Sequence, residues 1–325
     1  MSIESVNTIV SMVSMVSIVT IKSINMKLIE PKVELLSELD TTPESHIARC
    51  ARVCYGKEFK EPNQEADKKM VDGLIKRGHC SMLRHSSVYI GDLKKYPFCY
   101  NWLIDCSPYW SNNTLYEYAS TNLQEFEHFK KILMNGRAYK DDDEVIISII
   151  DNNSFLKECT ETSELFKLYR FTFCITTQIS TSRELNRKSP NNIAERSTRY
   201  SSSKDDLEIC KPWWFNAVSE NMSALNITKL PVKEKVFAMS WKDAESSYNK
   251  AIELGMKPED ARGILPLDTA TKVIYTYSVQ EWQHILDLRL YDKTGKAHPN
   301  CHVVMQMVRD QINSFAKEHN IDYQM

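Results

Sequence analysis

Two stretches of alternating hydrophobic and polar residues predict the strands around which this chain folds. From Leu168 to Thr177 every second side chain is aromatic or aliphatic, which is the period of a half-buried strand. The stretch from Thr271 to Tyr277 repeats this alternation. The positions assigned to the hydrophobic faces are Tyr169, Phe171, Phe173 and Ile175 in the first strand, and Val273, Tyr275 and Tyr277 in the second.

Hydrophobic residues spaced three and four apart predict the helices. The first should have Thr42 as its N-cap and Pro43 at its first position, because both residue types are favoured there. Its inward face is expected to carry Ile47, Cys50, Ala51 and Cys54. A second amphipathic helix is expected to end at Gly78, and a long one to span Val232–Met256. Another should begin at Pro258, and a further one should include Trp282–Arg289. The last helix is expected from His298 to Lys317, with Val303, Met307 and Ile312 on its core side.

The remaining segments define the domain organisation. Residues 26–325 are interpreted as a single domain, with an insertion at about 94–166 where the pattern is least readable apart from a helix expected over Thr121–Met134. The insertion is expected to decorate the surface or add subunit contacts, with an active-site lid as the alternative. Residues 1–25 hold a serine-interrupted apolar run that is too short to span a membrane. We interpret them as a dispensable or disordered extension, with a targeting peptide as the alternative.

Composition narrows the class of protein. Hydrophobic residues make up 42% of the chain and charged residues 26%, which is typical of a globular protein without a membrane segment. A net charge of −2 argues against a general nucleic-acid binder, because such proteins need an excess of Lys and Arg. The 9 cysteines form no Cys-x-x-Cys pair, which favours free thiols and a cytoplasmic location. His298, Cys301 and His302 lack a second ligand pair, so no metal site is expected.

The cations concentrate between Arg183 and Tyr200. Arg183 and Arg187 would share a face if the helix after the first strand continues to Lys188, and Pro190 should then force the chain into a loop. Guanidinium groups with nearby hydroxyls and amides suit an anionic ligand. The alternative is a salt-bridged surface helix followed by a polar loop. Neither Gly-x-Gly-x-x-Gly nor a P-loop motif occurs, so a bound nucleotide would have to be held by arginines and hydroxyls.

Four motifs, in order, resemble those of the flavin-dependent thymidylate synthases. In the central motif Arg187, Glu195, Ser197, Arg199 and Tyr200 fit the family spacing, whereas Lys188, Ser189 and Asn192 replace the family's His, Arg and Ser. The other motifs are an opening helix with Ala51-Arg52-Val53-Cys54-Tyr55, the Gly78-His79-x-Ser81 element that ends at His85, and the Ala261-Arg262-x-x-Leu265-Pro266 element, followed by Leu288-Arg289.

This resemblance covers Met26 to about Ala316 and carries several implications. It implies an α/β (α+β) fold with a central, mostly antiparallel sheet flanked by helices, assembled as a homotetramer with active sites between subunits. It implies FAD as cofactor, deoxyuridylate (dUMP) as substrate, and methylene-tetrahydrofolate and NADPH as co-substrates. A one-carbon unit would pass to C5 of uracil and be reduced by a flavin hydride, giving dTMP.

The resemblance also implies the site residues. Binding of dUMP is predicted for Glu184, Glu195, Ser197, Arg199, Arg262 and Arg289. FAD contacts are predicted for His79, Ser81, Arg187, Lys188, Ser189 and His284, with His85 in support. Arg289 is predicted to be catalytic, because a permanent cation at the uracil O2 edge stabilises the charge that develops when C5 reacts. Ser197 is expected to bind ligand rather than act as a nucleophile.

The departures from the family motifs leave two alternatives open. A related enzyme of the same fold could make another C5-modified deoxyuridylate, since Lys188, Ser189 and His284 differ from the family pattern. A non-catalytic nucleotide-binding paralogue that has lost flavin is the other.

Overall fold

The computed structural model describes residues 26–39, 41–56, 63–93, 104–105, 107–135, 148–198, 207–217 and 226–325. For residues 133–135 it describes the backbone alone. The expected extension at 1–25 therefore lies outside the described residues, as do Arg199 and Tyr200. Within the described ranges, no helix is both long enough and apolar enough to cross a membrane.

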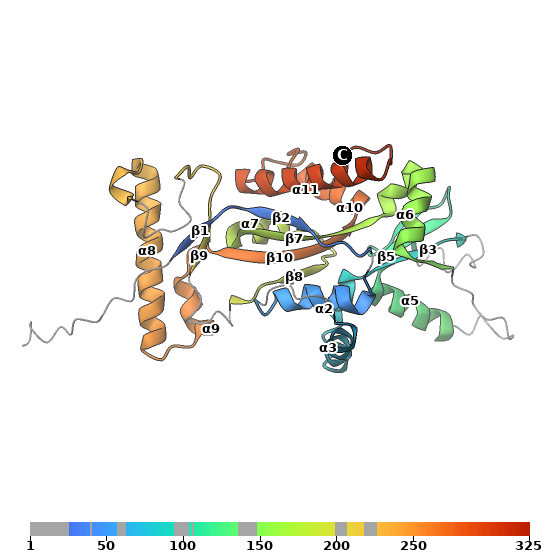
Figure 1. Cartoon of the computed structure of the whole chain (residues 1–325), viewed down its shortest axis with the longest axis horizontal. Helices are drawn as coiled ribbons and strands as arrows, with labels where there is room; N and C mark the ends of the chain where they lie inside the picture. The colour runs from blue at the N-terminus through green and yellow to red at the C-terminus, as the bar shows by residue number, and fades with distance from the viewer. Residues whose placement is uncertain are drawn as a thin grey trace, which may run out of the picture.

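A four-stranded antiparallel sheet lies in the middle of the molecule (Figure 1). Its order is β2 (Lys32–Leu35), β7 (Arg170–Gln178), β10 (Ala270–Ser278) and β8 (Ile193–Glu195). The two long strands pair from Arg170↔Ser278 to Gln178↔Ala270. The predicted fold class, a mostly antiparallel sheet flanked by helices, is confirmed.

Helices cover both faces of this sheet (Figure 1). On one face, α10 (Val279–Arg289) and α11 (Pro299–Glu318) pack on a hydrophobic core that includes Phe171, Phe173 and Tyr275. On the other face, α2 (Pro43–Val53) packs Cys50 and Val53 against Cys174 and Ile274. The predicted cap of α2 is confirmed, since the Thr42 side chain accepts a hydrogen bond from the backbone N of Ser45. Below α2 lie α3 (Gln64–Lys76) and the 3-10 turn η1 (Cys80–His85).

Because both faces are covered, the expectation of half-buried strands was wrong for β7. All nine of its residues are buried, including Arg170, Thr172 and Thr176. Their polar groups form hydrogen bonds and ion pairs inside the protein. For example, the hydroxyls of Thr172 and Thr276 are hydrogen-bonded at 2.8 Å. The alternating residue types of β7 therefore face two buried layers, one on each side of the sheet, and neither face is exposed to solvent.

A second antiparallel sheet forms entirely within residues 87–150. Its strand order is β4 (Ser111–Asn113), β5 (Tyr118–Asn122), β3 (Ser87–Ile90) and β6 (Ile149–Ile150). The helix α5 (Leu123–Asn135) packs Phe126 and Phe129 against Val88 and Ile90 in a core of its own. The helix expected from Thr121 starts two residues later, because Thr121 and Asn122 belong to β5.

The second sheet joins the central one through α6 (Asn152–Glu161) and η3 (Ser163–Leu168). The ring of Tyr89 in β3 stacks on Phe155 of α6 with centroids 4.1 Å apart. Both residues belong to the same hydrophobic core as Phe171 and Phe173, so the two sheets share buried contacts.

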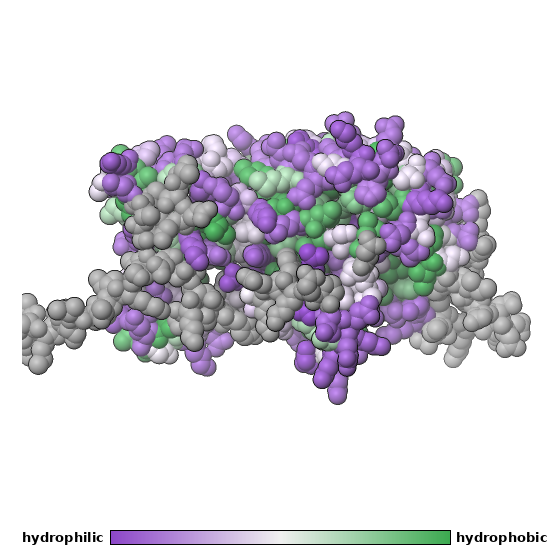
Figure 2. Space-filling model, in the orientation of Figure 1, coloured by the Kyte–Doolittle hydropathy of each residue, from purple (hydrophilic) through white to green (hydrophobic). Residues whose placement is uncertain are grey.

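The opposite end of the molecule is built from α8 (Val232–Glu253) and a parallel pair of short strands (Figure 1). The strands β1 (Lys27–Ile29) and β9 (Glu208–Cys210) place Leu28 and Ile209 against Trp241 of α8. The short elements η5 (Ile227–Lys229), α9 (Pro258–Ala261) and η6 (Arg262–Ile264) flank α8. Figure 2 shows a hydrophilic rim over α11 and hydrophobic residues at the surface along the middle of this face.

Two helix predictions need correction. The helix after β7, α7 (Ile179–Leu185), ends before Arg187, so Arg183 and Arg187 do not share a helix face. In α11 the predicted core positions Val303 and Met307 are only half-buried. Ile312 is buried as predicted, and the other hydrophobic residues of the buried face are Cys301, Val304, Met305, Val308, Phe315 and Ala316.

Candidate active site

A cavity of about 730 Å³ lies where α7, β8, η6 and the start of β10 meet. It brings together Glu195, Ser197 and Arg262, which the sequence predicted from two distant segments. Arg183 lines it as well. The full lining consists of Ile179, Ser182, Arg183, Glu195, Arg196, Ser197, Thr198, Arg262, Gly263, Leu265, Pro266, Leu267 and Thr271.

The carboxylate of Glu195 is fixed by three neutral donors. Its Oε1 accepts from the hydroxyl of Ser182 at 2.7 Å and from that of Thr271 at 3.2 Å. Its Oε2 accepts from the amide of Asn186 at 3.3 Å, and Asn186 in turn accepts from the phenol of Tyr275 at 2.6 Å. These bonds orient the carboxylate without cancelling its charge, so it can accept hydrogen bonds from a ligand.

Guanidinium groups dominate the charge of this cavity. Arg183, Arg196 and Arg262 line it against the single carboxylate Glu195, and Arg196 is paired with Glu208 at 3.5 Å. Arg262 is exposed and donates to the hydroxyl of Thr198 at 3.3 Å. The backbone N of Ser197 donates to the carbonyl of Cys54 at 3.0 Å, which ties this loop to the end of α2. The arrangement suits an anion that carries hydroxyl groups.

Two predicted substrate residues lie elsewhere in the chain. Glu184 neighbours Arg183 in α7, but it faces α10 and α11 rather than the cavity. Its Oε1 lies 3.9 Å from Nη1 of Arg289 and accepts from the backbone N of His298 at 3.3 Å. Neither Glu184 nor Arg289 lines the cavity, so a single chain does not bring all the predicted dUMP residues together.

The predicted FAD residues also lie outside this cavity. His79, Ser81, Arg187, Ser189 and His284 are exposed, and their side chains make no hydrogen bond or ion pair with any described residue. Lys188 lies 3.7 Å from Oε1 of Glu281 and over the ring of Tyr277. The guanidinium of Arg187 and the hydroxyls of Ser81 and Ser189 have no side-chain partner among the described residues, and such groups fit the diphosphate and polar ring edges of a flavin nucleotide.

Asn192, Arg84 and His85 belong to the motif segments and make hydrogen bonds within the chain. The side chain of Asn192 is buried and donates to the carbonyl of Thr276 at 2.9 Å, so it holds β8 against β10. Arg84 donates to Gln124 at 2.6 Å and to the carbonyl of Asn191 at 3.1 Å, which connects η1 to α5 and to the loop before β8. His85, expected to support the site, is buried, with Nδ1 2.9 Å from the hydroxyl of Thr276, and burial lowers its pKa to about 3.

The residues that orient Glu195 were missed by the sequence reasoning. Ser182 in α7 and Asn186 at its C-cap lie four apart, and this spacing places both side chains on one side of the helix, so the sequence held a signal for them. Thr271 and Tyr275 were assigned only as strand residues. Their roles follow from the pairing of β10 with β8, in which Val273 lies opposite Glu195.

Fold and cavity together define a mixed helix and sheet protein with an arginine-lined site for an anionic ligand. Comparison with known proteins gives the family. The family of thymidylate synthase complementing proteins matches residues 110–316, which is more than half of the chain. The chain belongs to this family, and the resemblance read from its motifs is confirmed.

Curated relatives and a solved structure are similar to parts of the chain. A flavin-dependent thymidylate synthase of Thermosipho melanesiensis is 30% identical over 122 residues, covering 37% of this chain and 53% of that protein. A probable flavin-dependent thymidylate synthase of Paramecium bursaria Chlorella virus 1 is 38% identical over 66 residues, covering 20% of this chain and 29% of that protein. The chain thus spans about half or less of the length of these relatives. A UMP/dUMP methylase from Streptomyces cacaoi, solved with 5-Br dUMP, is 14% identical with a TM-score of 0.38, covering 90% of this chain and 92% of that one.

Proposed function

We propose that this protein is a flavin-dependent thymidylate synthase. It would transfer a one-carbon unit from methylene-tetrahydrofolate to C5 of dUMP, with FAD as cofactor and NADPH as the reductant. The observation that carries the proposal is the cavity that unites Glu195, Ser197 and Arg262, since these residues come from two of the family motifs. Family membership of the chain supports the same reaction.

Different residues of the cavity would bind the phosphate and the sugar of dUMP. Arg262 and Arg183 are exposed guanidinium groups, suited to the phosphate of dUMP. Ser197 would add a hydroxyl contact, and Arg199 from the same loop would complete the phosphate site. Glu195, held in place by three donors, would accept from the sugar hydroxyl. An anchored carboxylate loses little entropy when it binds, so it adds selectivity for the sugar.

Arg289 would act from a neighbouring copy of the chain. Its guanidinium is orientated by Glu184 at 3.9 Å but lies outside the cavity of its own chain. A homotetramer would supply the contact, and exposed apolar side chains along α8, at Val232, Val236 and Met239, offer surface for such contacts. At the O2 edge of uracil, Arg289 would stabilise the negative charge that develops as C5 attacks.

The FAD would be held by His79, Ser81, Arg187, Lys188, Ser189 and His284. When bound, the flavin supplies the hydride that completes the new methyl group. The chain itself would orient the uracil, neutralise the phosphate and exclude water from the reacting carbon. Among these residues, Lys188 has its ammonium group near the carboxylate of Glu281 and over the ring of Tyr277, so it would serve as a positive charge of fixed position. The free thiols among the described cysteines suit a cytoplasmic enzyme.

Two measurements on the full chain test this proposal. The first is a visible spectrum of protein reconstituted with FAD, which should show a flavin band that bleaches with NADPH. The second is calorimetric binding of dUMP to the wild type, to Arg262→Ala and to the matched control Arg309→Ala, whose side chain pairs with Asp310 on the surface. Arg262→Ala should weaken binding by about 1.5–3 kcal/mol, since it removes hydrogen bonds to a charged group, and the control should not.

The two measurements can fail separately. Protein that never takes up FAD refutes the flavin chemistry but leaves a nucleotide-binding chain. Equal dUMP affinity in all three proteins refutes the cavity as the substrate site. Mass analysis of the nucleotide product, which should match dTMP, separates this enzyme from one that makes another C5-modified deoxyuridylate.

A further inference from the structure

A second cavity, of about 640 Å³, lies between the central sheet region and the second sheet. Its walls come from the segment after β2 and the starts of α2 and α3 on one side, and from β3, α5, β6 and the start of α6 on the other. It shares no lining residue with the arginine-lined cavity. Its volume is in the range of small-molecule sites.

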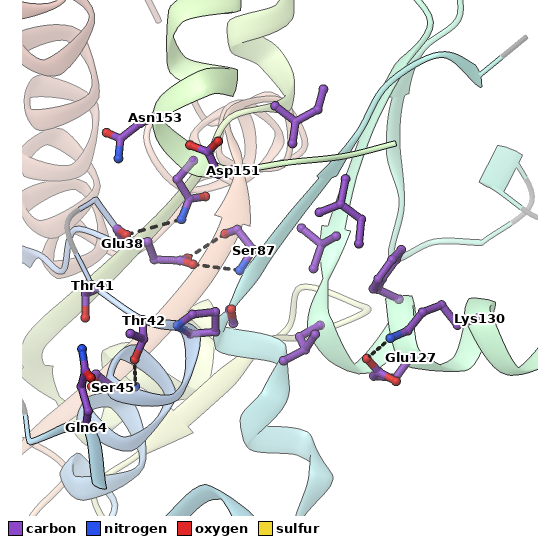
Figure 3. A pocket seen from close by; sticks show the side chains of 18 residues that line it. Glu38, Thr41, Thr42, Ser45, Gln64, Ser87, Glu127, Lys130, Asp151 and Asn153 are labelled. Carbon is purple, nitrogen blue, oxygen red and sulfur yellow. Dashed lines mark hydrogen bonds and ion pairs between the residues drawn. The ribbon is translucent and has the colours of Figure 1, made fainter. Parts of the chain in front are cut away.

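The two sides of this cavity differ in polarity. Figure 3 shows Glu38, Asp151, Asn153 and Thr41 on one side of the view, with carbon-only side chains between Ser87 and Lys130 on the other. The hydrophobic lining residues are Pro43, Val88, Leu123, Phe126, Ile149 and Ile150. A molecule that fills this space therefore needs a hydrocarbon body and one polar end.

Glu38 determines the chemistry of the polar end. Its side chain is 8% exposed, and its two oxygens accept from the backbone N of Ser87 at 2.9 Å and from the Ser87 hydroxyl at 2.7 Å. Burial raises its pKa to about 7, and the hydrogen bonds from Ser87 oppose this rise only in part. Burying a carboxylate without a cation in contact costs free energy, which is why the protonated form gains.

Among the residues that the structure describes, the neighbouring charged groups do not supply that cation. His46 Nε2 lies 3.7 Å from Oε1 of Glu38, but burial lowers the pKa of His46 to about 3, so the ring is neutral. Arg170 acts on Glu38 at longer range, and its guanidinium contacts Glu281 at 3.3 Å. Among the described residues, Cys50, Tyr89 and Tyr169 are further titratable groups that interact with Glu38.

The charges at the rim of the cavity also favour a cation. Lys130 is the one basic lining residue among those described, and it is paired with Glu127 at 2.5 Å. Asp151 remains as a carboxylate, because hydrogen bonds from Ser154 lower its pKa. Three carboxyl groups thus face one ammonium group, which disfavours an anionic ligand.

We propose that this cavity binds a small amphipathic amine, whose protonated nitrogen meets the carboxylate of Glu38 and whose hydrocarbon body packs against Val88, Leu123 and Phe126. The amine would supply the contacting cation that the buried carboxylate lacks within the described chain. Its body would cover hydrophobic side chains on the second sheet and α5 while its polar end contacts the central sheet region. Occupancy would therefore link the two parts of the fold.

Calorimetry on the full chain with benzylamine and benzyl alcohol tests the site. The two probes have nearly the same shape, and only benzylamine carries a charge. Benzylamine should bind saturably at pH 8, at least about tenfold more tightly than benzyl alcohol. Between pH 6 and pH 8 its affinity should rise about tenfold as Glu38 ionises, because its pKa is about 7 and the amine stays protonated throughout.

Matched variants locate the binding. Glu38→Gln should abolish both the preference for benzylamine and the pH dependence, while Glu34→Gln, on β2 and paired with Lys32, should leave both unchanged. Equal affinities for the two probes, a flat pH profile in the wild type, or unaltered benzylamine binding in Glu38→Gln would each overturn the proposal. Arg262→Ala should not affect benzylamine binding, so the outcome is independent of the proposed dUMP site.

Discussion

The two cavities place a glutamate in opposite surroundings. Glu195 lies in a cavity rich in arginine and is oriented by the neutral donors Ser182, Asn186 and Thr271. Glu38 lies against a cavity with hydrophobic walls, and its carboxylate accepts hydrogen bonds from the backbone N and the hydroxyl of Ser87 and from Thr172. Burial raises the pKa of Glu38 to about 7. Hydrogen bonds thus fix the orientation of Glu195, whereas burial makes Glu38 a group that binds a proton near neutral pH.

The largest expected effect concerns the arginine-rich region. Arg289→Ala should abolish turnover and weaken dUMP binding by about 2–5 kcal/mol, because the variant removes the cation that we propose stabilises charge on uracil. Steady-state assays of dTMP formation and calorimetry of dUMP binding measure the two effects. Arg309→Ala is the control for loss of a surface arginine. Near-normal turnover in Arg289→Ala would contradict the catalytic role.

The next effect concerns the stability of the Glu38 region. A pKa of about 7 in the folded chain, against an ordinary value of 4.5, means that the folded state binds the proton more tightly. Glu38 therefore lowers the free energy of unfolding as the pH rises from 4.5 through 7, by about 3 kcal/mol in total. Glu38→Gln cannot ionise, so its stability relative to the wild type should be greater at pH 8 than at pH 5.

Urea unfolding of both proteins at the two pH values checks this prediction. His46 and His85, with pKa values lowered to about 3, destabilise the fold as the pH falls below 6.5. They are present in both proteins, so their contribution cancels in the difference. A difference in stability that does not change with pH would show that Glu38 is ionised in the folded chain throughout this range.

A smaller effect tests how Glu195 is positioned. Ser182→Ala removes one of the three donors and should raise the KM for dUMP about fivefold, corresponding to about 1 kcal/mol for one hydrogen bond, with kcat little changed. Ser182→Thr keeps a hydroxyl at this position and should recover part of the loss. Kinetics with varied dUMP separate the two parameters, and an effect confined to kcat would point away from a role in substrate binding.

The smallest expected effect is that of removing residues 1–25. The domain is predicted to start at Met26, whose side chain is buried in the core beside Leu28 and Trp241. A chain that begins at Met26 should therefore retain activity and thermal stability. Circular dichroism melting and dTMP formation measure both, and loss of folding would contradict the predicted domain start.

Local sequence signals predicted the elements well where the signal acts within a few residues. Thr42 and Pro43 marked the start of α2, because a capping bond closes within one turn. The alternating residues of β7 and β10 located both strands. The motif residues Glu195, Ser197 and Arg262 do line one cavity, as the order of motifs suggested.

The failures share a physical cause. Alternation of residue types could not show that helices cover both faces of β7, because burial depends on elements distant in sequence. The end of α7 at Leu185 placed Arg187 outside the helix, although the charge pattern alone allowed the helix to continue. The second sheet was not predicted, since its short strands pair across loops of varied length and carry a weak pattern.

By itself, the sequence determined the family, the long strands and three of the residues that line the arginine-rich cavity, Glu195, Ser197 and Arg262, because motif order and local periodicity are properties of the chain. Only the tertiary structure decided that Arg289 pairs with Glu184 away from that cavity, and that Glu38 is buried beside a second one. Both outcomes depend on which surfaces meet after folding. Electrostatics and burial are set by those contacts, and Glu38 has no motif around it that would have revealed its environment.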